Sequence, residues 1–160
     1  MSRVIDFYNF IDSIAPFETQ ESWDNSGFLV GNGEKEVAKV LVALDATEDV
    51  LNEAAEKGAD LIITHHPVIF GALKEFHPKN IAFLAAEKGI AIISAHTCLD
   101  IAEGGVNDCL ANALGLKNVI KVDDGEDGRD QKVDENAFQA PAGAAAAGLI
   151  HAANLLFSFS

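Results

Sequence analysis

The sequence predicts an α/β fold with a mostly parallel sheet and helices packed on it. Two observations support this prediction. Three short apolar runs, each of strand length, alternate with three segments of helical periodicity between residues 40 and 115. Each helical segment ends at a glycine, which is the usual residue just past a helix end. Strands and helices in alternation indicate parallel strands joined by right-handed crossovers.

The elements before residue 40 are less regular. A first helix is predicted over residues 3–15, where apolar side chains recur at helical spacing, and Pro16 ends it. A polar and aromatic loop covers residues 21–27, and a short apolar run covers residues 28–30. The sequence Gly31-Asn32-Gly33 predicts a turn.

The alternating part begins with a continuous apolar run, residues 40–44, which is typical of a strand buried on both faces. Thr47 can cap the helix that follows, and Gly58 ends that helix. The next strand is predicted at residues 61–64.

The later elements follow the same order. Pro78 is predicted to open a helix over residues 78–88, and a third strand covers residues 90–95. Gly104-Gly105 leads into a helix that Gly115 closes.

One short pattern occurs twice, at an offset of 31 residues. Ala-Ala-Glu-Lys-Gly ends at Gly58 and again at Gly89, and a histidine follows each glycine seven residues later. Duplication of a βαβ unit and the common use of these residues at helix ends both explain the pattern. Either origin predicts that His65 and His96 lie at equivalent heights at the ends of their strands.

The predicted domain organisation is a lobe at residues 1–120 and a tail at residues 121–160. Residues 123–135 contain seven acidic residues and one apolar residue, which is typical of a solvated linker or loop. The Ala-rich stretch 141–160 is read as a helix. Its most apolar part, residues 142–159, is slightly short of the roughly 20 residues of a membrane span.

Composition narrows the classes of partner. The formal charge is −14, from 25 acidic and 11 basic residues. Such a balance repels nucleic acid and anionic membranes and favours cations, although it also serves plain solubility. No secretory signal is visible at the start of the chain. The only cysteines, Cys98 and Cys109, are not in a CxxC pair, so a reducing cytoplasm is expected.

Candidate metal ligands follow the predicted strands. Asp45, His65, His66 and His96 each lie just past a strand end, and Asp100 lies four residues after His96. Ligands bind beyond the carboxyl ends of parallel strands, so these side chains should converge. Imidazoles with a carboxylate suit Zn, Mn, Fe, Co or Ni.

The doublet His65-His66 suggests two ions. Neighbouring side chains on a regular strand point to opposite sides, so each histidine could hold a separate divalent ion, with Asp100 bridging them. The alternative is one ligand and one packed histidine. His96 is predicted to orient Asp100 from beside the site, although it could also be a ligand, and Asp24 joins His96 as a candidate for proton transfer.

Three other residues are interpreted as structural. His77 and His151 are expected to be surface residues, and Cys98 is expected to be a buried thiol, although a soft ligand or a nucleophile is conceivable there.

Three motifs in order resemble the GTP cyclohydrolase 1 type 2 homolog family, also known as NGG-interacting-factor-like proteins. The motifs are Trp23–Gly31, Thr64–Phe70 and Ser94–Asp100, and the resemblance runs from about residue 3 to residue 120. It implies a dinuclear metal site in which His65, His66 and Asp100 are ligands and His96 lies beside them. It also implies a toroidal homohexamer with its metals facing an internal cavity.

The chain departs from the family's pattern in its tail. The resemblance implies a second lobe that contributes a late His-x-x-x-Glu pair, but here His151 is followed four residues later by Leu155. A divergent ending, a truncation and a shifted reading frame are all open as explanations of the tail.

Three functions remain in competition. The first is a dinuclear metal-dependent hydrolase acting on a small molecule such as a purine nucleotide or another cyclic amide. The family's GTP cyclohydrolase label implies this function. The second is a non-catalytic metal-binding assembly or regulatory protein. The third is a truncated, inactive fragment.

Overall fold

A computed structural model describes residues 1–123 and 130–134. The chain divides into two compact units, residues 1–99 and residues 100–160. The predicted boundary at residue 120 stays a prediction, since most of the residues beyond it lie outside the described part of the chain.

The first unit contains helices around one sheet. In chain order its elements are α1 (Val4–Ile14), η1 (Phe17–Thr19), β1 (Gly27–Val30), β2 (Val40–Ala43), α2 (Glu48–Lys57), β3 (Leu61–Thr64), α3 (Ile81–Lys88) and β4 (Ala91–Ser94). Helix α4 (Thr97–Ile101) begins in this unit and ends in the second one.

The sheet confirms the predicted fold class. Its strand order is β1-β4-β3-β2, with β2, β3 and β4 parallel and β1 antiparallel to β4. Leu61 of β3 lies beside Val40 of β2 and Ala91 of β4, so the three parallel strands end at the same edge. The residues that follow them therefore meet there.

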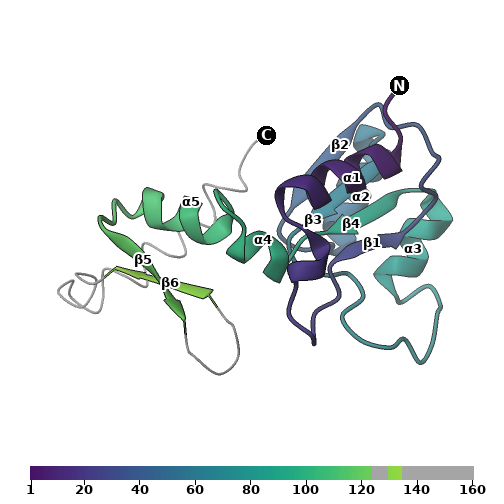
Figure 1. The fold of residues 1–160 in the computed structure, drawn as a ribbon. Coiled ribbons are helices and arrows are strands. Elements are labelled where there is room, and N and C mark those ends of the chain that lie inside the picture. The colour runs from purple at the N-terminus through teal and green to yellow at the C-terminus, as the bar shows by residue number, and fades with distance from the viewer. Residues whose placement is uncertain (124–129, 135–160) are drawn as a thin grey trace. The chain divides into compact units, whose positions relative to one another are not determined.

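Helices lie on both faces of this sheet (Figure 1). Strand side chains alternate between the faces, so Leu61 and Ile93 pack with Val4 and Ile11 of α1. Their neighbours Ile62 and Ile92 pack on the other face, in the core that α2 and α3 line. Burial on both faces explains why the first three residues of β3 and of β4 are all apolar.

Strand β2 differs from the prediction. Its apolar run suggested a strand buried on both faces, but β2 is an edge strand and Val42 is 60% exposed. Periodicity cannot separate the two cases, because an apolar run says nothing of how many neighbours a strand has. The predicted start of the third helix was also wrong. Asn80 caps α3 by accepting a hydrogen bond from the backbone N–H of Phe83, so Pro78 lies in the preceding loop.

Other local predictions are confirmed. The Thr47 hydroxyl accepts a hydrogen bond from the backbone N–H of Val50 at the start of α2, and Gly58 ends that helix with a left-handed backbone. Gly31 is required in the predicted turn for two reasons. Its φ is +112°, and an added Cβ would lie 2.9 Å from Ala91 of β4.

The second unit contains α5 (Val106–Ala113) and an antiparallel pair, β5 (Val119–Asp123) and β6 (Asp130–Asp134). The predicted solvated loop over 123–135 is therefore wrong for β6. Backbone hydrogen bonds between strands form whatever the charge of the side chains, so acidity alone did not exclude a strand. The predicted helix at 141–160 lies outside the described residues. Within the described part of the chain, none of the helices has the length and apolar character that crossing a membrane requires.

Candidate metal centre

The parallel strands bring four predicted residues to one edge of the sheet. The ladder continues past the strand ends, where the N–H of His65 donates to the carbonyl oxygen of Ala43 and the N–H of His66 donates to that of Leu44. Asp45 follows Leu44 in the segment just after β2. The convergence of Asp45, His65, His66 and His96 expected from the sequence is therefore present.

His65 and His96 were predicted at equivalent heights, but the sheet register places them one position apart. Thr64 pairs with Ser94, so His65 lies level with Ala95 and His96 is one residue further along. The repeat in the sequence has an offset of 31 residues, whereas the paired strands have an offset of 30. The ring centroids of His65 and His96 are nevertheless only 5.0 Å apart.

All three imidazoles lie together. The ring centroid of His66 is 5.0 Å from that of His65 and 5.4 Å from that of His96. Because His65 and His66 lie beyond the end of β3, the strict alternation of a regular strand does not separate their rings. We call His65, His66 and His96 the histidine cluster.

The ring of His65 is held by the neighbouring strand end. This residue is 9% exposed, and its Nδ1 lies 2.9 Å from the carbonyl oxygen of Ala95. A carbonyl oxygen can only accept, so Nδ1 carries the hydrogen and the lone pair of the neutral ring is on Nε2.

The ring of His66 is held by a carboxylate. Its Nδ1 lies 2.7 Å from Oδ1 of Asp45, and both side chains are about half exposed. Donation from Nδ1 to this oxygen again leaves the lone pair of the neutral ring on Nε2. A carboxylate that orients a histidine in this way is the usual companion of a histidine metal ligand.

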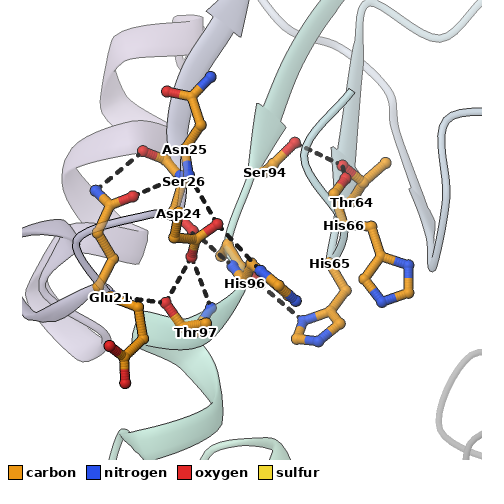
Figure 2. A network of polar contacts seen from close by, with 12 residues as sticks. Glu21, Asp24, Asn25, Ser26, Thr64, His65, His66, Ser94, His96 and Thr97 are labelled. Carbon is orange, nitrogen blue, oxygen red and sulfur yellow. Dashed lines mark hydrogen bonds and ion pairs between the residues drawn. The ribbon is translucent and has the colours of Figure 1, made fainter. Parts of the chain in front are cut away.

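His96 is held by a more deeply buried carboxylate. Its Nδ1 lies 3.0 Å from Oδ1 of Asp24, whose side chain is fully buried. Figure 2 shows His96 between Asp24 and His65, with the Asp24 carboxylate surrounded by hydrogen-bond donors. Those donors are His96 Nδ1, the Asn25 N–H, the Ser26 hydroxyl, and the N–H and hydroxyl of Thr97.

These donors determine the charge of Asp24. Burial raises the pKa of its carboxyl group, but the hydrogen bonds from Thr97, His96 and Asn25 outweigh burial and lower the pKa to about 2. Asp24 is therefore an anion at neutral pH. It accepts the Nδ1 hydrogen of His96.

The histidine cluster can hold a metal ion. One ligand atom from each ring lies within 4.8 Å of the others. Each ring is oriented through its Nδ1 by a different acceptor, Ala95, Asp45 or Asp24. The sequence placed His96 beside the site, whereas its geometry also qualifies it as a ligand.

Asp100 remains a predicted ligand. It lies in α4, one helical turn after Thr97, but belongs to the second compact unit. The other singled-out residues are distinct from the cluster. His77 is partly exposed and hydrogen-bonded to Glu75, and Cys98 is buried as expected, which raises the pKa of its thiol. His151 lies outside the described residues.

Two polar residues of this site were not singled out in the sequence. Ser26 and Thr97 are both buried and donate to Asp24, and the hydroxyl of Ser26 also accepts the N–H of His96. The signal available was their place within the first and third motifs. Neither pattern shows which carboxylate they serve, since more than 70 residues separate Asp24 from Thr97.

A model of the family Duf34/NIF3 (NGG1p interacting factor 3) matches residues 2–154. The chain belongs to the Duf34/NIF3 family. This confirms the resemblance inferred from the three motifs, and the match continues past residue 120, where that resemblance was last traced.

Curated members of the Duf34/NIF3 family support the assignment. The GTP cyclohydrolase 1 type 2 homolog of Staphylococcus aureus (strain N315) is 41% identical over 128 residues, covering 78% of this chain and 35% of the relative. That of Clostridium perfringens is 42% identical over 130 residues, covering 76% of this chain and 48% of the relative.

Solved structures agree. The hypothetical protein SA1388 of Staphylococcus aureus has a TM-score of 0.70 at 41% identity, covering 76% of this chain and 42% of the other. Reduced HcgD from Methanocaldococcus jannaschii has a TM-score of 0.69 at 34% identity, covering 74% of this chain and 49% of HcgD. The chain thus spans less than half the length of these relatives.

Proposed function

We propose that this chain is a divalent-metal-binding protein whose histidine cluster holds at least one ion. The observation that carries the proposal is the common arrangement of three imidazoles. Each donates its Nδ1 hydrogen to a fixed acceptor, and their ligand atoms lie within 4.8 Å of one another. Neutral imidazoles arranged in this way are the commonest protein ligands of Zn, Fe, Co and Ni, and they also serve Mn.

The electrostatics of the site favour a cation. Asp24 and Asp45 each contact a ring of the cluster, so a bound ion has two carboxylates directly behind its ligands. The chain as a whole carries a formal charge of −14. Both features lower the energy of a positive ion relative to that of an anionic ligand bound alone.

A second ion is part of the proposal, on the basis of the resemblance to the family. Asp100 is its proposed ligand and would bridge the two ions. The test of the number of ions is direct. Elemental analysis of Asp100→Ala is expected to show one ion fewer than in the unchanged protein. An equal number in both proteins would exclude Asp100 as the ligand of a second ion.

The experiment that tests metal binding compares four proteins. The unchanged chain is expected to bind Zn²⁺ with a definite stoichiometry, measured by calorimetry and elemental analysis after dialysis. His65→Ala and His96→Ala should lose this binding. His77→Ala should keep it, because His77 is a partly exposed histidine outside the cluster. Equal metal content in all four proteins would exclude the cluster as the site.

Hydrolysis is the second candidate function. A bound divalent ion supplies Lewis-acid chemistry to such a site. The chain's own contribution would be the buried pair of Asp24 and His96, in which the carboxylate holds the ring through its Nδ1 hydrogen. The test is turnover of a panel of purine nucleotides and cyclic amides by the metal-loaded protein. Activity that disappears in His65→Ala supports hydrolysis, and no turnover on the whole panel favours metal binding without catalysis.

Two further proposals concern assembly and location. We propose that the chain self-associates, with a hexamer as the family-based expectation, which sedimentation analysis of the purified chain tests. We also propose a reducing cytoplasm as its location. Both cysteines, Cys98 and Cys109, are free thiols in the structure. A monomer at micromolar concentration would contradict the first proposal, and export of a tagged chain from the cell would contradict the second.

A further inference from the structure

We infer that Trp23 and Phe70 form a stacking surface for a planar aromatic ring, and that the ligand carrying this ring presents an oxygen donor to the metal held by the histidine cluster. This inference rests on the proposed function, because the cluster must hold an ion for the oxygen donor to be bound. It adds the chemical class of the ligand to that function.

The two aromatic side chains lie together and face solvent. Trp23 is 51% exposed and Phe70 is 55% exposed. Their ring centroids are 6.0 Å apart, with an angle of 43° between the planes. Large aromatic side chains gain most of their stabilisation from burial, so an exposed pair next to a polar site is a candidate for covering by a ligand.

The loops that carry these rings are fixed to each other. The side-chain Nδ2 of Asn25 donates to the carbonyl oxygen of Ile69 at 2.6 Å, which joins the loop of Trp23 to the loop of Phe70. Asp24, the residue after Trp23, is held by Ser26 and Thr97. The surface is thus formed before any ligand arrives, which reduces the entropy lost on binding.

The position of Trp23 connects this surface to the cluster. Its ring centroid is 6.1 Å from that of His96, with an edge-to-face angle of 73°. Stacked or tilted aromatic pairs have centroids about 4.5–7 Å apart, so a ligand ring that stacks on Trp23 on the side facing His96 lies within reach of the histidine cluster. A site of three histidines characteristically leaves one coordination position for a non-protein ligand. A carboxylate or carbonyl oxygen attached to the stacked ring is suited to that position.

The structure also provides a matched control. Phe76 is 55% exposed, the same fraction as Phe70, and lies in the same loop region. Its ring packs against Phe83, with centroids 5.2 Å apart. Replacing Phe76 therefore removes an exposed phenyl ring of equal exposure that is not part of the surface formed by Trp23 and Phe70.

The experiment uses the full chain loaded with Zn²⁺ and two probe anions, 2-naphthoate and its saturated analogue decahydro-2-naphthoate. Calorimetry is expected to show tighter binding of the aromatic probe. Trp23→Leu and Phe70→Leu should each weaken 2-naphthoate binding by about threefold to tenfold and leave the saturated probe and Zn²⁺ affinity unchanged. Phe76→Leu should change none of these affinities. Trp23 is the only tryptophan, so its single indole N–H signal in NMR spectra should shift when 2-naphthoate is added.

The outcomes separate the two proposals. Equal affinities for both probes, or an equal loss in Phe76→Leu, would overturn the stacking surface while Zn²⁺ binding still supported the proposed function. Absence of Zn²⁺ binding by the unchanged chain would overturn the proposed function and this inference with it. A preference for the aromatic probe that disappears only with Trp23 or Phe70 would establish the surface.

Discussion

Oδ1 of Asp45 lies 2.7 Å from Nδ1 of His66, although the two residues follow different strands. Asp45 comes after β2 and His66 after β3, and the parallel register of these strands places the two residues side by side. The carboxylate thereby orients a ring of the histidine cluster without being counted among its ligands.

Removing the Asp45 carboxylate is expected to weaken metal binding without abolishing it. Carboxylates that hydrogen-bond to a histidine metal ligand typically contribute about 10–100-fold in metal affinity. Asp45→Asn should therefore reduce Zn²⁺ affinity by about that factor. The measurement is competition against a chelator of known affinity. Asp49→Asn is the matched control, because Asp49 is also exposed and contributes the same formal charge. An equal loss in both variants would show that general electrostatics, rather than orientation of His66, is responsible.

Asp24 is expected to make the free energy of unfolding of the metal-free protein depend on pH in the acidic range. Its folded-state pKa of about 2 lies below the ordinary value of 3.8, so the folded state favours the ionised form. The stability that this contributes is fully present above pH 3.8 and is lost as the pH falls through about 2. After allowance for screening by solvent, it amounts to roughly 1–2 kcal/mol.

The measurement is the free energy of unfolding against pH, with a chelator present to remove metal. Asp24→Asn should be less stable at neutral pH, because an amide nitrogen would face the donors of Thr97 and Ser26. It should also lose part of the decline between pH 4 and pH 2 that the unchanged protein shows. An unaltered pH profile in the variant would contradict the assignment.

Gly31 is expected to be less tolerant of substitution than Gly58. Both have positive φ, but an added Cβ at Gly31 would overlap Ala91 at 2.9 Å, whereas at Gly58 it would meet no atom within 4 Å. Gly58→Ala should therefore cost about 1 kcal/mol, from backbone strain alone. Gly31→Ala should cost roughly 2–4 kcal/mol, from strain together with overpacking. Denaturant unfolding measures both, and equal costs would show that the β4 backbone yields easily.

The two cysteines are expected to react at different rates. Cys98 is fully buried and burial raises the pKa of its thiol, whereas Cys109 is partly exposed. Under native conditions iodoacetamide should modify Cys109 at least about tenfold faster than Cys98, as read by mass spectrometry of peptides. Urea should equalise the rates. Fast modification of native Cys98 would show that α4 opens readily.

Most of the fold could be predicted from local signals. The Thr47 cap and the Gly58 end of α2 depend on residues close in sequence, and the pattern predicted both correctly, although it placed the start of α3 at Pro78 instead of after Asn80. The failures in the strands come from pairing between segments that are apart in sequence. The exposure of β2 depends on its having one neighbour, and the β5–β6 pair depends on backbone hydrogen bonds between segments that look polar.

The sequence by itself determined the family, the parallel order of the strands and the presence of histidines at the strand ends. Each of these follows from residue types and their spacing along the chain. Only the tertiary structure decided that His96 joins His65 and His66, and that Ala95, Asp45 and Asp24 hold their Nδ1 atoms. The reason is that these contacts join residues on separate strands and loops, and a shift of one position in sheet register would change every one of them.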